Sequence, residues 1–225
     1  MFNKSVLAGV CLMALTCGAQ AADSVDLKVT GTLVNGSCTP SLENGGVVDF
    51  GHIPLGNLNK TTANQIGYKI INLTISCDSA MPIGWNTVDN RANSVVSNLY
   101  PDALANKSPV YVFGLGMNGD KKMGNYSISV DPTLPVADGV SAHGIYCQSQ
   151  TGNNCLWTDL AVRPQAQPSI RTITVAKDST DLTPLAFKTA VFPLKIAAVI
   201  DSTDNLAITD DTNLDGSATI ALVYL

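Results

Sequence analysis

The sequence has few of the residues on which enzymes and nucleic-acid-binding proteins depend. Charged residues make up 14% of the chain, there are 2 histidines, and 18 acidic side chains outnumber 13 basic ones. The resulting net charge of −5 disfavours a nucleic-acid partner, which needs a basic face. His52 and His143 stand in no catalytic or metal-binding motif, and no nucleophile has a neighbouring base. We therefore expect no enzyme activity, no cofactor and no metal centre.

Long apolar runs are also missing after the first residues, so we expect no membrane-spanning segment. The N-terminus itself has a lysine at position 4, an apolar stretch from Val6 to Thr16, and the small-residue pattern Ala19-Gln20-Ala21. These are the features of a secretory signal peptide, which we predict to span residues 1–21. An exported chain of about 200 residues would remain after cleavage, enough for one large β domain.

Four cysteines follow the predicted signal peptide, and none is part of a C-x-x-C pair: Cys38, Cys77, Cys147 and Cys155. In an exported protein an even number of cysteines indicates disulfides rather than a metal site. Three pairings are possible, and the most economical one joins Cys38 to Cys77 and Cys147 to Cys155. These bridges would close loops of about 40 and about 9 residues, worth roughly 4 and roughly 2.5 kcal/mol through chain entropy.

Alternating apolar and polar residues, without a capped helical stripe, predict an all-β protein. The predicted strands cover residues 25–34, 69–77, 171–177, 191–200 and 218–224. Clusters of glycine, asparagine and aspartate predict turns between them, including Asp78–Gly84, Asn118-Gly119 and Asp215-Gly216. The polar stretch Gly144–Cys155 predicts an exposed insertion stapled by a disulfide. We see no linker that would divide residues 31–225, which we expect to form a single sandwich domain.

The order and spacing of several segments resemble one family. A strand runs through Gly31 into the letters TLVNGSC, a second cysteine ends a strand some forty residues later, and VVDFGHIPLG stands at 47–56. The chain closes on an apolar strand with a penultimate tyrosine, Tyr224. Over about residues 25–78 and 185–225 this resembles subunits of the chaperone–usher fimbrial family. More narrowly, it is similar to a fimbrial-like branch of exported proteobacterial proteins.

The resemblance implies an immunoglobulin-like (pilin-type) sandwich that lacks its last strand and needs a donor strand. It implies a role in adhesion as a structural or minor fimbrial subunit of a Gram-negative bacterium, in the periplasm in transit and then at the cell surface. The partners it implies are a periplasmic pilus chaperone, an outer-membrane usher and other fimbrial subunits. A strand lent by a partner would pair with the open sheet edge and fill the groove with alternate side chains.

Individual residues can be carried over from the resemblance. Residues 22–30 match the N-terminal extension, whose donor-strand positions are Val25, Leu27 and Val29. The terminal strand matches the one that borders the groove and meets the chaperone, with the positions Ala218, Ile220, Leu222, Tyr224 and the carboxylate of Leu225. One departure concerns the donor segment, which in this family usually has a glycine at the pocket position where Val25 stands.

Two other functions stay open at this level. Trp85 and Trp157 could stack on sugar rings, which would make the protein a tip-type adhesin for a host glycan. The short extension before Val29 could instead complete the sandwich of its own chain, which would make a stand-alone periplasmic protein. An apolar terminal strand without a charged residue fits a partner-binding edge, but it also fits an ordinary core strand.

Overall fold

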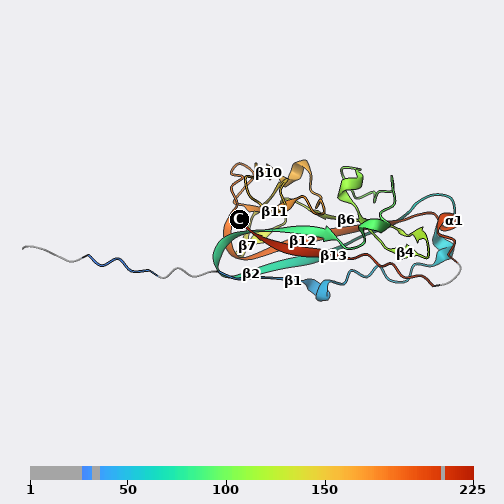
Figure 1. Ribbon diagram of the computed structural model, residues 1–225, viewed down its shortest axis with the longest axis horizontal. Coiled ribbons are helices and arrows are strands. Elements are labelled where there is room, and N and C mark those ends of the chain that lie inside the picture. The colour runs from blue at the N-terminus through green and yellow to red at the C-terminus, as the bar shows by residue number, and fades with distance from the viewer. Residues whose placement is uncertain (1–26, 32–35, 209–210) are drawn as a thin grey trace, which may run out of the picture. The chain divides into compact units, whose positions relative to one another are not determined.

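A computed structural model describes residues 27–31, 36–208 and 211–225 of the chain (Figure 1). The chain divides into two units, residues 1–34 and residues 35–225. In the first unit, residues 27–31 belong to no strand, so this part of the strand predicted over 25–34 is not formed. The predicted signal peptide and Val25 lie outside the described residues.

The second unit is built almost wholly of strands, as the sequence predicts. Its strands are β1 (Cys38–Leu42), β2 (Asn64–Asp89), β3 (Phe113–Gly114), β4 (Met117–Asn118), β5 (Lys121–Lys122), β6 (Gly124–Val130), β7 (Val136–Ala137), β8 (Val140–Ser141), β9 (His143–Cys147), β10 (Thr158–Asp159), β11 (Thr172–Ala176), β12 (Ala186–Ile200) and β13 (Ala218–Tyr224). The helical turns are η1 (Glu43–Gly46), η2 (Leu55–Asn57), η3 (Ala92–Ser94), η4 (Pro109–Tyr111), η5 (Leu160–Val162) and α1 (Thr203–Leu206).

The long strand β2 organises the sheet. Its first half pairs with β1 on one edge and β12 on the other, and its second half pairs with β11 and β13. The strand order is β10-β9-β11-β2-β12-β6-β3, and all these pairings are antiparallel. Because β2 takes different partners along its length, it joins two groups of strands.

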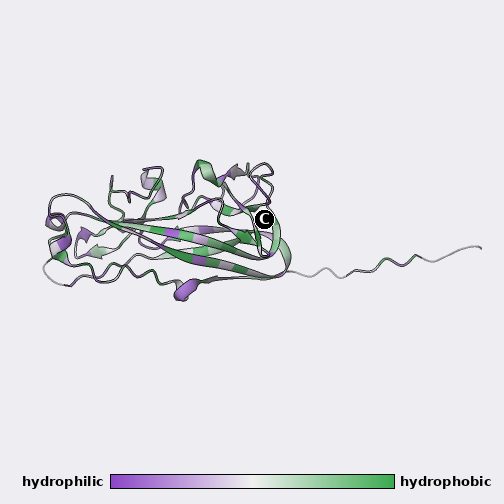
Figure 2. Cartoon of the chain, turned by 180° about the vertical axis from the view of Figure 1, so that it is seen from behind, coloured by the Kyte–Doolittle hydropathy of each residue, from purple (hydrophilic) through white to green (hydrophobic). Residues whose placement is uncertain are grey.

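Side-chain alternation explains which faces are buried. In β2 the apolar residues Ile71, Leu73 and Ile75 are buried, while Asn72 and Thr74 between them are partly exposed. Figure 2 shows the same alternation as bands along the long strands. The last residues of β12, from Ile196 to Ile200, are all buried, which accounts for their continuous apolar sequence.

One apolar core joins both groups of strands. Trp85 of β2 packs its ring edge-on against Phe192 of β12, with centroids 5.8 Å apart. Phe113 of β3 stacks on Tyr126 of β6 at 5.1 Å. Since each group of strands contributes large aromatic side chains, the core holds β2, β6 and β12 together with the second half of the sheet.

Both predicted disulfides are present. Cys38 is bonded to Cys77 and joins the paired strands β1 and β2, and Cys147 is bonded to Cys155 across the loop that follows β9. The stapled insertion is shorter than predicted, because Gly144–Cys147 belongs to β9 and pairs with β11. Disulfides of this kind are typical of a protein that has been exported to an oxidising compartment.

Two predicted turns are wrong. Residues Asp78–Gly84 lie inside β2, where Met81 pairs with Phe187 of β12 but Ser76 pairs with Thr189. The extra residues of β2 form a bulge, which tolerates the polar sequence without reversing the chain. Asp215-Gly216 lies in no turn, and the Asp215 amide instead donates to the distant Leu115 carbonyl at 2.9 Å. The third turn is confirmed: Asn118-Gly119 lies in the hairpin of β4 and β5, and Gly119 has a φ of 56°.

Candidate strand-binding groove

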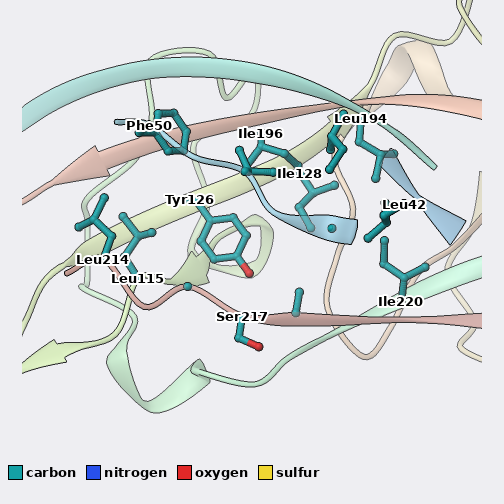
Figure 3. A pocket seen from close by; sticks show the side chains of 15 residues that line it. Leu42, Phe50, Leu115, Tyr126, Ile128, Leu194, Ile196, Leu214, Ser217 and Ile220 are labelled. Carbon is teal, nitrogen blue, oxygen red and sulfur yellow. The ribbon is translucent and has the colours of Figure 1, made fainter. Parts of the chain in front are cut away.

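An apolar cavity of about 270 Å³ lies within the second unit, between two chain segments (Figure 3). One wall is the segment from the end of β1 onward, with Leu42, Val48 and Phe50. The opposite wall is the segment from Leu214 to Ile220, which leads into β13. The floor consists of core side chains from β2, β6 and β12: Ile71, Tyr126, Ile128, Leu194 and Ile196.

A second cavity continues the first along the same two segments. It has a volume of about 580 Å³ and shares Val48, Phe50 and Leu214 with the first. Its remaining lining comes chiefly from residues 49–58, from Ile208 and from residues 211–213, and it includes polar side chains as well as apolar ones. We call the two cavities together the strand groove, because an elongated channel between two chain segments has the form of a missing strand.

The edge of β13 that faces away from β2 is open. Within the described chain, β13 pairs only with β2, from Ala218 opposite Asp89 to Tyr224 opposite Ile83. Its apolar side chains Ala218, Ile220 and Leu222 are only partly buried, although they pack against the core. Their incomplete burial follows from the absence of a neighbouring strand on this side.

The opposite wall has free backbone as well. In the part of the chain that the structure describes, the backbone of residues 48–53 makes one hydrogen bond, from the Gly51 amide to Asp49 Oδ1 at 2.7 Å. That bond is local to a turn, so it joins this wall to no other strand. Val48, Phe50 and Ile53 are partly buried against the core and direct this segment along the groove.

Tyr224 links the terminal strand β13 to the first strand β1. Its hydroxyl accepts a hydrogen bond from the Cys38 amide at 3.2 Å, which links the end of β13 to the start of β1. The disulfide from Cys38 to Cys77 fixes that start to β2. The penultimate tyrosine therefore holds the terminal strand to the first strand.

The last residue is held on the other face of the same sheet. A Cβ atom added to Gly152 would lie 2.3 Å from Leu225 Cδ2 and 3.3 Å from Val223 Cγ1. The glycine, with a φ of 71°, thus sits directly on these two side chains. Asn86 of β2 holds the same loop by donating to the Gln150 carbonyl at 2.8 Å. The stapled loop consequently covers the outer face of the terminal strand, where Val223 is buried.

Tyr126 is the main polar group on the groove floor. Among the described residues, none forms a hydrogen bond with its hydroxyl, and the ring packs against Gly216, whose added Cβ would lie 3.0 Å from Tyr126 Cε1. Burial raises the pKa of Tyr126, the nearby charge of Asp89 raises it further, and Arg91 opposes both. The hydroxyl therefore stays protonated and can donate to a groove occupant.

The structure brings together part of the predicted site. Ala218 and Ile220 line the groove, Leu222 packs against the core, and the Tyr224 hydroxyl accepts from the Cys38 amide. Leu27 and Val29 belong to the first unit, where their side chains are 89% and 87% exposed. Sequence reasoning gave no role to the opposite wall, although the letters VVDFGHIPLG contain its apolar residues Val48, Phe50 and Ile53.

The predicted sugar-stacking pair is not formed. Trp85 is completely buried in the core, where it packs against Phe192, so its ring is not available to a ligand. Trp157 is partly buried beside the stapled loop. Of the two tryptophans considered for sugar stacking, Trp85 is therefore inaccessible, and Trp157 is the one with a partly exposed side chain.

No described helix has the length and apolar character needed to cross a membrane.

Comparison with known proteins gives a family without an established activity. Residues 27–127 match the family described as "Protein of unknown function (DUF1120)". The chain is 31% identical to "Uncharacterized protein YhcF" of Escherichia coli K12 over 241 residues, which cover 99% of this chain and 98% of the relative. It is also 31% identical to "Protein GltF" of the same organism over 266 residues, covering all of both chains. The chain therefore belongs to the DUF1120 family, together with YhcF and GltF.

Proposed function

We propose that the protein is a subunit of a chaperone–usher fimbria, or a fimbrial-like protein of that kind, whose domain is completed by a β-strand from another chain. The observation that carries the proposal is the strand groove, an apolar channel with open backbone on both walls. A strand inserted there would pair with the free edge of β13 and cover the half-buried residues beneath it. The completed domain would be an immunoglobulin-like sandwich whose last strand comes from another chain.

The energetics favour occupation of the groove. Each apolar side chain that is fully buried contributes roughly 1.5–3 kcal/mol, so three on one strand would give a strong interface. Pairing also removes the cost of poorly solvated backbone groups, which is about 1–3 kcal/mol for each one that is buried without a partner. An empty groove is therefore the less stable state, and a periplasmic chaperone would cover it before assembly.

We infer that the final occupant is the N-terminal segment of a neighbouring subunit of the same kind. Leu27 and Val29 alternate on one face of that segment and are nearly fully exposed. Lys28 and Thr30 on the other face are polar and would point to solvent when the apolar face is inserted. Passage through the periplasm, transfer at an outer-membrane usher and a role in adhesion belong to the same proposal, and the two disulfides support export.

The groove side of the proposal can be tested with a carboxylate placed on the terminal strand. Ile220→Asp puts a charge into the apolar channel, whereas Ala221→Asp puts the same charge on the exposed opposite face of β13. We expect Ile220→Asp to abolish co-purification with a co-expressed fimbrial chaperone, because an unpaired carboxylate cannot be buried under an inserted strand. Ala221→Asp should co-purify like the unmodified chain.

The amount of chaperone that elutes with tagged subunit from periplasmic extracts gives the measurement. Equal recovery with both variants would contradict a partner strand in the groove. So would an unmodified chain that accumulates as a stable monomer without any chaperone, because its domain would then be complete by itself.

A further inference from the structure

Away from the strand groove, two arginines converge on one tyrosine hydroxyl. Tyr111 ends η4, Arg163 follows η5, and Arg171 precedes β11. The Arg163 Nη1 and Arg171 Nη2 atoms each donate to the Tyr111 hydroxyl at 3.5 Å. Two arginines eight positions apart thus place two positive charges around the hydroxyl oxygen of a tyrosine more than fifty positions away in sequence.

Arg171 is buried without a carboxylate. Its guanidinium donates to the Gln148 side chain at 3.2 Å, to the Arg163 carbonyl at 3.1 Å and to the Gln165 carbonyl. It also stacks over the rings of Tyr146 and Tyr111, at 4.1 and 5.1 Å. These dipoles and aromatic faces stabilise the cation, but they carry no negative charge. Burial lowers the pKa of Arg171, and Arg163 contributes to the same direction.

Arg163 brings a second charge that also lacks an acidic partner. In the described part of the chain, neither arginine lies within 4.0 Å of a carboxylate, although the sequence has 18 acidic residues against 13 basic ones. Arg163 is exposed, so its guanidinium has donors that face solvent. The hydroxyl of Tyr111 accepts from both arginines, and no described residue accepts its own hydrogen.

We propose that Arg163, Tyr111 and Arg171 form an oxyanion-binding site. The guanidinium of Arg163 presents two parallel donors, the geometry that recognises a carboxylate or sulfate group. The Tyr111 hydroxyl supplies a third donor, and the buried charge of Arg171 strengthens the field at this point. Val110 and Val162 stand next to Tyr111 and Arg163 in the sequence and are exposed, so they can contact the carbon skeleton of a ligand. We therefore expect the oxyanion to be part of a larger organic molecule, either small or polymeric.

The test uses the complete mature chain, labelled with ¹⁵N, and follows the side-chain Nε–Hε resonances of its arginines during salt titrations. Sodium sulfate and sodium acetate are the probes, and sodium chloride at equal ionic strength is the control. We expect a saturable shift of the Arg163 resonance with at least one oxyanion and none with chloride. The tighter of the two probes shows whether the site prefers a tetrahedral or a planar group.

Two variants separate a built site from general charge attraction. In the Arg163 variants binding is followed through the Arg171 Nε–Hε resonance, because Arg171 shares the Tyr111 hydroxyl with Arg163. Arg163→Gln should weaken oxyanion binding by about tenfold or more, since it removes the paired charge-assisted hydrogen bonds. Lys107→Gln removes a positive charge from an exposed residue paired with Asp102 and should bind like the unmodified chain. Arg163→Lys keeps the charge but loses the fork, so its affinity should also fall. A linear response without saturation, or equal weakening by Arg163→Gln and Lys107→Gln, would overturn the proposal.

Discussion

At the scale of single residues, the carboxylate of Asp159 joins two elements of the fold. His143 of β9 and Asp159 of β10 form a hydrogen bond of 2.8 Å between Nε2 and Oδ1, and both side chains are partly buried. The same carboxylate caps η5 by accepting from the Ala161 amide at 2.8 Å. Burial alone raises the pKa of Asp159, but the hydrogen bonds from Ala161 and His143 outweigh it, and the pKa is lowered.

This lowered pKa predicts how stability depends on pH. The folded state favours the ionised carboxylate, so its contribution is complete above the unfolded pKa of about 4 and is lost as the pH falls through the lower folded value. We expect Asp159→Asn to cost about 1 kcal/mol at pH 7, because its amide oxygen can still accept from Ala161 but lacks the charge that strengthens the hydrogen bonds to the carboxylate. The cost should vanish in strongly acidic solution. Urea unfolding between pH 2 and pH 7 measures this.

The control for this residue is His143→Gln, whose amide can still donate to Asp159. It should keep most of the acid dependence, because the cap to Ala161 remains. A loss of stability for Asp159→Asn that is the same at every pH would show that packing, rather than ionisation, matters at this position.

At the scale of elements, the stapled loop acts on the terminal strand. Asn86 and Thr172 hold its backbone at Gln150 and Ser149, and Gly152 rests on Leu225. The bridge between Cys147 and Cys155 limits the freedom of this loop in the unfolded chain and keeps it on the sheet in the folded one. The protection of β13 therefore depends on the disulfide between Cys147 and Cys155, although no residue of β13 takes part in that bond.

Replacing both cysteines of this bridge by serine should lower the free energy of unfolding by roughly 2.5 kcal/mol, as expected for a loop of about nine residues. The amides of Leu222 to Leu225 should exchange with deuterium faster than those of β12, because only the former lose the covering loop. Chemical unfolding measures the change in the free energy of unfolding, and hydrogen exchange followed by mass spectrometry measures the exchange rates of the two strands. Uniform acceleration across β12 and β13 would contradict a local role of the loop.

Local patterns explain why parts of β2, β11, β12 and β13 could be predicted. The alternation at 69–77 and the apolar runs at 191–200 and 218–224 reflect which side chains are buried in β2, β12 and β13. These patterns can be recognised from residues that are adjacent in the sequence. The bulge at residues 77–80 could not be predicted, because the residues that accommodate it lie more than a hundred positions away, at Phe187 and Thr189. The polar residues of the bulge lie within the pairing of β2 with β12, which cannot be recognised from the local sequence.

The groove was predictable on one side only. The apolar sequence predicted the terminal strand, and the resemblance to fimbrial subunits implied that Ala218 and Ile220 border a groove, which they line. The opposite wall, with Val48 and Phe50, is an irregular segment with no strand of its own, so periodicity gave no signal. Leu214 belongs to a stretch whose sequence predicts a turn, whereas the structure has no turn there and the next residue, Asp215, donates to the distant Leu115 carbonyl.

At the scale of the whole molecule, the central question is which chain fills the groove. Under the proposed function the two units of the chain would supply both halves of a complementary pair: a segment with exposed Leu27 and Val29, and a domain with an apolar cavity. If the segment serves another subunit, association must depend on protein concentration. If it serves its own domain, association is intramolecular and concentration has no effect.

We expect the mature chain, refolded without a chaperone, to form oligomers whose size increases with concentration in analytical ultracentrifugation. The double variant Leu27→Asp/Val29→Asp should remain monomeric, because losing two buried apolar side chains removes roughly 3–6 kcal/mol from the interface. That loss corresponds to a dissociation constant about 10²–10⁴ times higher. The matched double variant Lys28→Asp/Thr30→Asp changes the other face of the segment and should still assemble. A mature chain that is monomeric at every concentration, and that Leu27→Asp/Val29→Asp destabilises towards urea, would instead establish that the segment completes its own domain.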